Sequence, residues 1–227
     1  MSRGWFITGS DTGCGKTRVA CALLHACRQQ GLRTLAMKPV ASGCEHQGER
    51  LVNDDALALM AATDVPLSYE AVNPYALSLP VSPHLAAAEM GVTIDIAALA
   101  AHYAALRRQA DVAVVEGVGG WRAPLTEQHT VADLALGLEL PVILVVGIGL
   151  GCLNHALLSA EAIARDGARL AGWVANRRDP ACLMADRIIA TLAEKIPAPL
   201  LGVMPYAKKM DARASAAHLD IHPLLVD

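Results

Sequence analysis

The sequence predicts an α/β fold in which helices cover both faces of a mostly parallel sheet. Short apolar segments alternate with helical patterns from one end of the chain to the other, as in successive strand–helix–strand units. A glycine-rich stretch joins the first apolar segment to the first helical pattern, and no Ser/Gly linker or repeat interrupts the chain. We therefore expect one domain over residues 1–227, with a loosely held tail after about Asp211.

Six apolar segments are predicted to be strands. Each is rich in Val, Ile or Leu or is bounded by turn residues. They are residues 4–8, 34–39, 112–116, 142–147, 170–176 and 200–204.

Helical patterns fill the intervals between these strands. Residues 16–30 place Val19, Leu23 and Cys27 on one face, and a glycine follows at position 31, where a left-handed residue ends a helix. Ser82 and Pro83 have the pattern of a helix cap and first turn, for a helix that runs to about position 90. A further helix is expected over residues 94–109, so that two helices lengthen one crossover.

The composition raises the question of a membrane span. Hydrophobic residues make up 54% of the chain and the mean hydropathy is +0.36. The longest apolar stretch, residues 140–153, contains Pro141 and three glycines and is shorter than the roughly 20 residues that cross a bilayer. We expect a strand and a loop there and no membrane span. Because Phe6 and Ile7 run directly into Thr8, no signal peptide is expected, and the predicted location is cytoplasmic.

Charge and cysteine content exclude other classes of protein. The net charge is −3 and no run of basic residues is present, which argues against nucleic acid as a partner. The six cysteines form no C-x-x-C pair, so free thiols are expected. The eight histidines form no paired metal motif.

The most specific local pattern is Gly-Ser-Asp-Thr-Gly-Cys-Gly-Lys-Thr at positions 9–17, between the first predicted strand and the first predicted helix. This is the context of a P-loop, in which backbone N–H groups bind phosphates at a helix N-terminus. Lys16 would reach the terminal phosphates of ATP and the Thr17 hydroxyl would bind Mg2+. Ser10 stands where the strict motif has glycine, and a small residue there still permits the turn. The alternative is a glycine-rich turn that only joins strand to helix.

Two carboxylates are candidates for the same magnesium site. The strand at 112–116 ends in Glu116 and is followed by Gly-Val-Gly-Gly, so the carboxylate lies at the edge where parallel strands end and the glycines let the backbone approach a nucleotide. Asp55 lies in the Asn-Asp-Asp stretch that opens a helix. Alternatively, Glu116 is a solvated acid at a strand end and the second stretch serves only to cap its helix.

Lys38 closes the second predicted strand, next to Pro39. A lysine at a strand end is often a solvated surface charge. Here the strand ends point toward the expected triphosphate, so a second cation could neutralise an anionic substrate beside the γ-phosphate.

Together these segments resemble the dethiobiotin synthetase family. The specific matches are Lys-Pro-Val-Ala-Ser-Gly at 38–43, Glu-Gly-Val-Gly-Gly at 116–120 and Gly-Cys-Leu-Asn-His at 151–155. Further matches are residues 8–17, 53–57, 73–75, 141–146, 171–176 and 197–202. The resemblance covers nearly the whole chain in order.

The resemblance implies an ATP- and Mg2+-dependent ligase that forms the ureido ring of dethiobiotin from 7,8-diaminononanoate and CO2 or bicarbonate. A carbamate would attack the γ-phosphate of ATP, with Lys16, Lys38 and magnesium between the two anions. Such transfer depends on positioning and charge stabilisation. The implied catalytic residues are Lys38, Lys16 and Thr12.

The resemblance also assigns binding residues. Thr12 and Ser42 would contact the diamine or its carbamate, and Asn176 would read adenine. The implied ATP-binding residues are Gly13, Cys14, Gly15, Lys16, Thr17, Asp55, Glu116, Gly117, Val118, Gly119, Asn176, Arg177, Pro205, Tyr206 and Ala207.

A segment of the resemblance points to a homodimer. Leu150, Gly151, Cys152 and Asn154 correspond to the family segment that holds the substrate carboxylate from a neighbouring subunit. A helix that begins near Asn154 would present free N–H groups to that anion.

The chain departs from the family at two of these positions and in the base-side segment, where residues 205–207 lead into 208–211 with no clear acidic match. Gly13 replaces a common acid in the loop, and Arg177 stands where an acid is frequent. Two other functions are compatible with the loop alone, a partitioning-type switch ATPase and a non-catalytic nucleotide-binding relative. The first commonly has an additional lysine early in the loop, where this chain has Ser10, and the second has no use for Lys38 together with residues 151–154.

Overall fold

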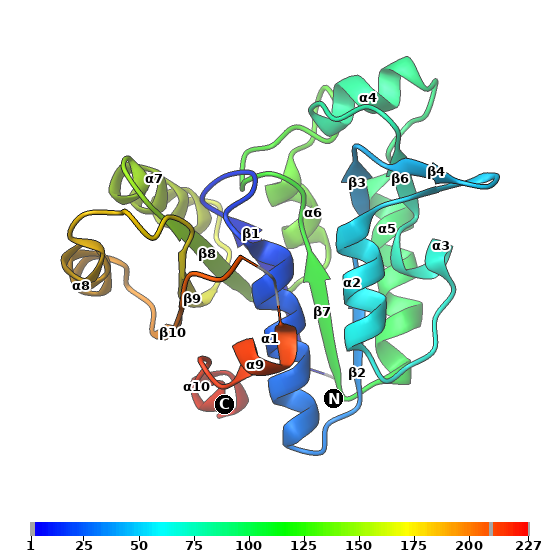
Figure 1. Ribbon diagram of the computed structural model, residues 1–227. Coiled ribbons are helices and arrows are strands. Elements are labelled where there is room, and N and C mark those ends of the chain that lie inside the picture. The colour runs from blue at the N-terminus through cyan, green and yellow to red at the C-terminus, as the bar shows by residue number, and fades with distance from the viewer. Residues whose placement is uncertain (1–2, 209–210, 227) are drawn as a thin grey trace.

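The computed structural model describes residues 3–208 and 211–226, and it contains one central sheet of parallel strands (Figure 1). The strand order is β10-β9-β8-β1-β7-β2. All six strands predicted from the sequence are present: β1 (Arg3–Gly9), β2 (Thr34–Met37), β7 (Val112–Glu116), β8 (Val142–Ile148), β9 (Leu170–Arg177) and β10 (Leu200–Met204). The order confirms the expected mostly parallel sheet.

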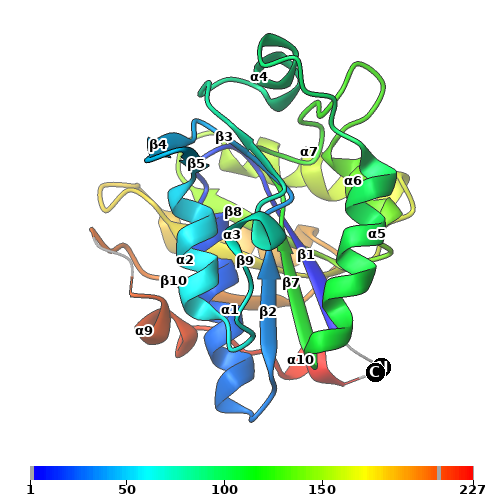
Figure 2. The same ribbon diagram turned by 90° about the vertical axis from the view of Figure 1, so that its right-hand side faces the viewer.

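Helices cover both faces of this sheet, as predicted (Figures 1 and 2). Along β1, Trp5 and Ile7 pack into one buried cluster and Phe6 into the other, because successive side chains of a strand point to opposite faces. One face carries α1 (Lys16–Gln29), α2 (Asp54–Ala62), α9 (Ala212–Ala216) and α10 (His222–Leu225). The other carries α5 (Ile96–Leu106), α6 (Val131–Gly137), α7 (Cys152–Arg165) and α8 (Ala185–Lys195).

The crossover from β2 to β7 contains four short strands that the sequence did not predict. They are the parallel pair β3 (Val40–Ser42) and β6 (Tyr75–Leu77), and the antiparallel pair β4 (Glu45–Gln47) and β5 (Arg50–Val52). The crossover also holds α3 (Tyr69–Val72), α4 (Pro83–Glu89) and the 3-10 turn η1 (Arg107–Gln109). Figure 2 shows α4 and the β4–β5 hairpin above the C-terminal edge of the sheet.

Several element ends differ from the predictions by up to three residues, for local reasons. The second strand ends at Met37, since the Lys38 N–H donates to the Val72 carbonyl instead of to a neighbouring sheet strand. The helix expected from position 94 begins at Ile96, because the Asp95 side chain accepts the Ala98 N–H and caps it.

The C-terminal segment is packed, which corrects the expectation of a loosely held tail. α9 lies against α1, and Ser215 is buried there. Ile221 and Leu224 join the same apolar cluster as α1. The short helices are therefore part of the core layer on that face.

No helix over residues 3–208 and 211–226 is long and apolar enough to span a membrane. The apolar stretch at 140–153 forms β8 and the turn into α7, as predicted. All six cysteines are free thiols, also as predicted.

Candidate functional site

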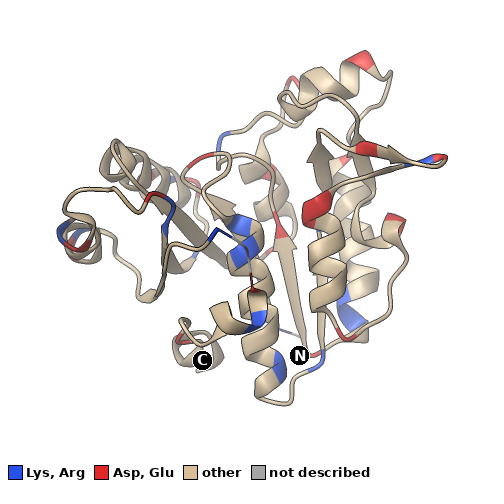
Figure 3. Ribbon diagram, in the orientation of Figure 1, with Lys and Arg blue, Asp and Glu red and all other residues tan. Residues whose placement is uncertain are grey.

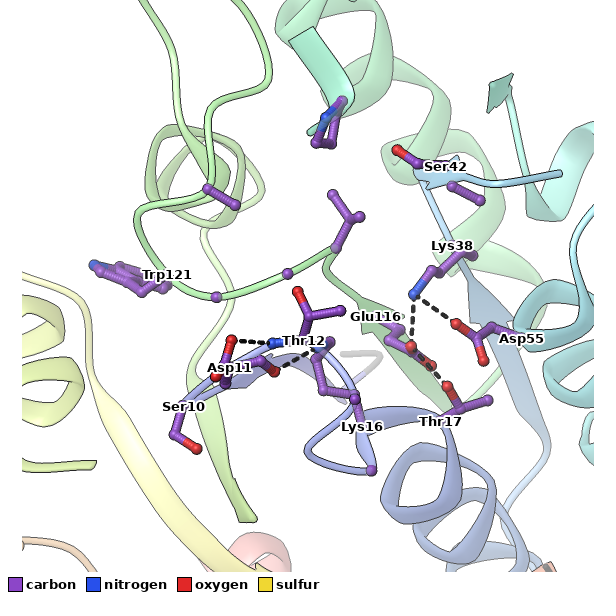
Figure 4. Close-up of a pocket in the computed structure, with 18 of the residues that line it drawn as sticks. Ser10, Asp11, Thr12, Lys16, Thr17, Lys38, Ser42, Asp55, Glu116 and Trp121 are labelled. Carbon is purple, nitrogen blue, oxygen red and sulfur yellow. Dashed lines mark hydrogen bonds and ion pairs between the residues drawn. The ribbon is translucent and has the colours of Figure 1, made fainter. Parts of the chain in front are cut away.

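The predicted site residues meet in a cavity of about 960 Å³ at the C-terminal edge of the sheet (Figure 4). The cavity lies where β1, β7 and β2 end, which is where parallel strands gather their functional side chains. The predicted residues that line it are Thr12, Gly13, Gly15, Lys16, Thr17, Lys38, Ser42, Asp55, Glu116, Val118 and Gly119.

The loop between β1 and α1 has the form that phosphate binding requires. Gly13 and Gly15 have φ of 68° and 100°, values that favour glycine. The buried Lys16 ammonium donates to the Asp11 carbonyl oxygen (3.2 Å) and thereby folds over the loop (Figure 4). A Cβ at Gly9 would lie 2.4 Å from Cys14 Sγ, so this fold needs its first glycine at position 9, one place before the strict motif.

A buried charge cluster stands beside the loop. Lys38 Nζ lies 2.6 Å from Glu116 Oε1 and 3.4 Å from Asp55 Oδ2. The Thr17 hydroxyl donates to the same Glu116 oxygen (3.0 Å). Lys38 is therefore a buried, paired cation that faces the cavity, and not a solvated surface charge (Figure 4).

Burial and pairing shift both pKa values of this cluster. Burial opposes the charged form of Lys38, but Glu116 and Asp55 outweigh it and hold the Lys38 pKa above its ordinary value. Desolvation raises the pKa of Glu116, against the attraction of Lys38. Each charge thus depends on its partner to remain in the protein interior.

The same residues fit a magnesium ion. Thr17 supplies a hydroxyl, and Glu116 and Asp55 supply carboxylates, the hard oxygen ligands that Mg2+ prefers. Glu116 Oε2 is buried and has no hydrogen-bond partner among the described residues. An oxygen left without a partner beside a P-loop hydroxyl is the observation that favours a cation there.

Lys38 and Asp55 are held in place by residues that sequence reasoning did not single out. Asn73 Nδ2 donates to the Lys38 carbonyl (2.7 Å), and Tyr69 donates its hydroxyl to Asn73 Oδ1 (2.9 Å). The same Tyr69 oxygen accepts the N–H of Asn53, the N-cap of α2 (2.8 Å). Because Asn53 Oδ1 accepts the Asp55 N–H (3.1 Å), one hydrogen-bonded chain joins the two charged residues. Its signals in the sequence were the matches at 53–57 and 73–75.

Two further contacts shape the loop after β7. A Cβ at Gly117 would lie 3.0 Å from the Phe6 ring, so the backbone passes close to the core. Trp121 Nε1 and an Arg122 N–H both donate to Asp166, at the C-terminus of α7 (2.7 and 2.8 Å). The loop with Val118 and Gly119 is thus fixed at both ends.

Asn176 lies beside the loop with its amide engaged. Its Nδ2 donates to the Cys14 carbonyl (2.8 Å), and its Oδ1 accepts from Arg18 (3.2 Å). The Pro205 carbonyl also accepts from Arg18 (2.6 Å). Arg177 forms an ion pair with Asp186 on α8.

Other predicted residues lie outside the cavity. Tyr206 and Ala207 are exposed beyond β10. Leu150 is fully exposed, and α7 begins at Cys152, two residues before Asn154, after Gly151 in a left-handed conformation (φ 89°). Among the described residues, 150–154 are not part of the cavity lining.

Solved structures share this fold at low sequence identity. The chain is similar to a cobyrinic acid a,c-diamide synthase from Mycobacterium smegmatis solved with bound ADP and magnesium, with a TM-score of 0.55 and 19% identity over 96% of this chain and 92% of that one. It is also similar to the septum site-determining protein MinD from Pyrococcus horikoshii OT3, complexed with Mg-ADP, with a TM-score of 0.56 and 18% identity over 90% and 82% of the two chains. These likenesses show a P-loop fold.

Closer relatives come from sequence. A family model described as an AAA domain matches residues 3–214. The ATP-dependent dethiobiotin synthetase BioD of Aromatoleum aromaticum is 54% identical over 217 residues, 96% of each chain. That of Pseudomonas aeruginosa is 54% identical over 223 residues, 97% of each chain. The chain therefore belongs to the dethiobiotin synthetase family and is an ATP-dependent ligase.

Proposed function

We propose that the protein closes the ureido ring of dethiobiotin from 7,8-diaminononanoate and CO2 or bicarbonate, with ATP and Mg2+. The observation that carries the proposal is the buried Lys38, which lies beside the phosphate loop and faces the cavity. A plain ATPase has no need of this second cation, whereas a reaction between a carbamate and a triphosphate does.

The proposed sequence has three bond-forming steps. One amine of the substrate adds to CO2 and loses a proton, which gives a carbamate. A carbamate oxygen attacks the γ-phosphorus, the bond to the β-phosphate oxygen breaks, and ADP leaves with that electron pair. The second amine then attacks the carbamoyl carbon, phosphate leaves, and the amine loses a proton as the ring closes.

The residues of the cavity perform the positioning that these steps require. Lys16 donates to the terminal phosphates and Lys38 to the carbamate, so that both anions approach without mutual repulsion. Thr12 and Ser42 contact the diamine or its carbamate. The buried Ser42 hydroxyl has no hydrogen-bond partner among the described residues, which supports a contact to substrate.

Magnesium would be held by Thr17, Glu116 and Asp55. When bound, it neutralises charge on the transferring phosphate. The Lys38 ammonium, which pairs with Glu116, would face the carbamate within the cavity.

The substrate carboxylate is assigned to a neighbouring copy of the chain, through Leu150, Gly151, Cys152 and Asn154. The exposure of Leu150 and the position of this segment outside its own cavity support the assignment. The first turn of α7 supplies backbone N–H groups to an anion. The working unit is accordingly a homodimer.

The base side of the nucleotide is assigned to the ends of β9 and β10. Asn176 reads adenine, and Arg177, Pro205, Tyr206 and Ala207 flank it.

The proposed location is the cytoplasm. The six free thiols, five of them buried, are consistent with a reducing compartment.

The test is phosphate release from ATP with and without each proposed substrate. Release should require both the diamine and bicarbonate, and mass spectrometry should detect dethiobiotin.

Lys38→Ala should lower turnover at least about a hundredfold while ATP binding is retained, because one charge-stabilising donor is removed. Its thermal unfolding must be recorded, since it leaves Glu116 unpaired. Equal phosphate release without the diamine, or unchanged turnover in Lys38→Ala, contradicts the proposal.

A further inference from the structure

Arg18 lies beside the phosphate loop, outside the cluster of Lys38 and Glu116. It is in the first turn of α1, where the positive end of the helix dipole opposes a cation. Burial also lowers the pKa of its guanidinium. The position is therefore unfavourable for a charge unless other contacts compensate.

Three acceptors from the C-terminal part of the chain supply this compensation. Arg18 Nη1 donates to the Pro205 carbonyl (2.6 Å) and to Asn176 Oδ1 (3.2 Å). Its Nε donates to Ser215 Oγ (3.1 Å). The acceptors belong to β9, to the segment after β10 and to α9, which lies alongside α1 (Figure 1). One planar guanidinium thus ties α1 to three separate segments.

The contact with Asn176 sets the orientation of an amide. Asn176 Oδ1 faces Arg18 and Nδ2 faces the Cys14 carbonyl, so each end meets a complementary group. Rotation of the amide by half a turn would place its NH2 group against guanidinium N–H groups and its oxygen against a carbonyl oxygen. The amide also touches the loop, since a Cβ at Gly15 would lie 2.1 Å from Nδ2.

We propose that Arg18 is a positioning residue that sets the nucleobase preference of the site by fixing the orientation of the Asn176 amide. The inference rests on the adenine contact assigned to Asn176 in the proposed function. After the two bonds described, the oxygen can still accept one hydrogen bond and the NH2 group can still donate one. This pair complements the N6 donor and N7 acceptor of adenine, whereas guanine presents two acceptors, O6 and N7.

Arg18 therefore acts against guanine as well as for adenine. Without it, the amide oxygen loses the donor that holds it in place, and the NH2 group can turn toward a guanine O6. In Arg18→Ala, ATP would lose an oriented hydrogen-bond partner and GTP would gain one. The substitution should therefore change the ratio of the ATP and GTP affinities, and not only the stability of the fold.

The experiment is calorimetric binding of ATP and of GTP, each with Mg2+ and without the diamine, to wild type and Arg18→Ala. Wild type should prefer ATP. Arg18→Ala should lower the ATP-to-GTP affinity ratio by about tenfold. Arg18→Lys keeps the charge but lacks the planar fork, and its ratio should lie between the two.

Two controls separate orientation from general loss of structure. Arg28 lies on the same helix, where it is half-buried and paired with Asp64 (2.7 Å), and Arg28→Ala should leave the affinity ratio unchanged. Ser215→Ala removes one acceptor of the same guanidinium while it leaves the bond to Asn176, and it should also keep the ratio.

An unchanged ratio in Arg18→Ala, or no preference in wild type, overturns the inference, as does an equal change in the Arg28 control. If Arg18→Ala does not fold, the ratio of Arg18→Lys decides. Because binding is measured without the diamine, failure of the proposed ligase reaction appears separately, as phosphate release that does not require the diamine.

Discussion

Gly13 and Gly15 share a left-handed backbone in the phosphate loop but differ in their surroundings. A Cβ at Gly13 meets nothing within 4 Å, whereas one at Gly15 would lie 2.1 Å from Asn176 Nδ2. Alanine in this left-handed conformation costs about 1–2 kcal/mol of backbone strain at either position. The two alanine variants can therefore be compared with each other for the effect of the side chain alone.

We predict that Gly15→Ala weakens ATP binding at least about tenfold, because it displaces the amide that donates to the Cys14 carbonyl. Gly13→Ala should change the ATP dissociation constant by less than about threefold, as its side chain meets open space. Calorimetric titration of both variants provides the measurement. Equal losses would show that backbone strain alone controls the loop.

The open space at Gly13 also bears on the departure from the family at this position. A Cβ at position 13 would point into open space and would contact no neighbouring atom within 4 Å. The replacement of an acid by glycine therefore removes no packing contact of that atom in this structure. The backbone of position 13 remains in the left-handed region that glycine tolerates best.

Two charged residues of the site could be predicted from the sequence because they stand at the ends of predicted parallel strands, and such ends lie at a known edge of the sheet. Glu116 is the last residue of one apolar strand and Lys38 follows another, and parallel strands end at one edge. Arg18, Tyr69 and Asn73 were missed as positioning residues, since their roles depend on hydrogen bonds whose partners no local pattern specifies. Arg18, for example, meets Asn176 across 158 residues of chain.

At the scale of elements, α6 begins with a charge-assisted cap. The N–H and the hydroxyl of Thr130 both donate to Asp133 Oδ2 (2.6 and 2.8 Å). Burial raises the pKa of Asp133, but these hydrogen bonds outweigh it and hold the pKa below its ordinary value. A carboxyl with a depressed pKa stabilises the fold above its unfolded pKa, and this contribution is lost as pH falls through the folded pKa.

Asp133→Asn should therefore lower the free energy of unfolding by about 1 kcal/mol near neutral pH. The difference from wild type should persist down to about pH 5 and shrink below about pH 4. Urea unfolding without nucleotide, across this pH range, measures it. Asp54→Asn removes an exposed first-turn charge for which the structure shows no side-chain hydrogen bond, and it serves as the control. A difference that grows in acid would contradict the assignment.

The main strands were predictable and the short ones were not, for one physical reason. Runs such as Val142–Ile148 are long enough and apolar enough to indicate a buried parallel strand. β3, β4, β5 and β6 have three residues each, too few to establish a period of two, and tertiary contacts define them. The tail was misjudged similarly, since α9 and α10 are five and four residues long and depend on α1 for burial.

At the scale of the whole molecule, charge is distributed unevenly around the sheet. In the ribbon of Figure 3, basic residues (blue) occur along α1 and an acidic residue (red) stands at the C-terminal end of β7. In the proposed dimer, the group that holds the substrate carboxylate comes from the neighbouring subunit.

We predict that two inactive variants restore activity when refolded together. Lys38→Ala disables the cavity, and Asn154→Glu places an acid in the exposed first turn of α7, where it suits the helix dipole but repels a substrate carboxylate. A mixed dimer retains one site with both groups intact, so an equal mixture should recover about a quarter of wild-type activity. Dethiobiotin formation measures it, with each variant alone as control. No recovery would place residues 150–154 outside the partner's site.

The buried pair of Lys38 and Glu116 also bears on the order of folding. The two residues are 78 positions apart, and Glu116 does not meet Lys38 until β2 docks beside β7. An unpaired charge in the interior is strongly unfavourable, so we expect the pairing of β2 with β7 across this long crossover to coincide with closure of the ion pair. A chain that completes its sheet thereby brings together the charged residues of its cavity.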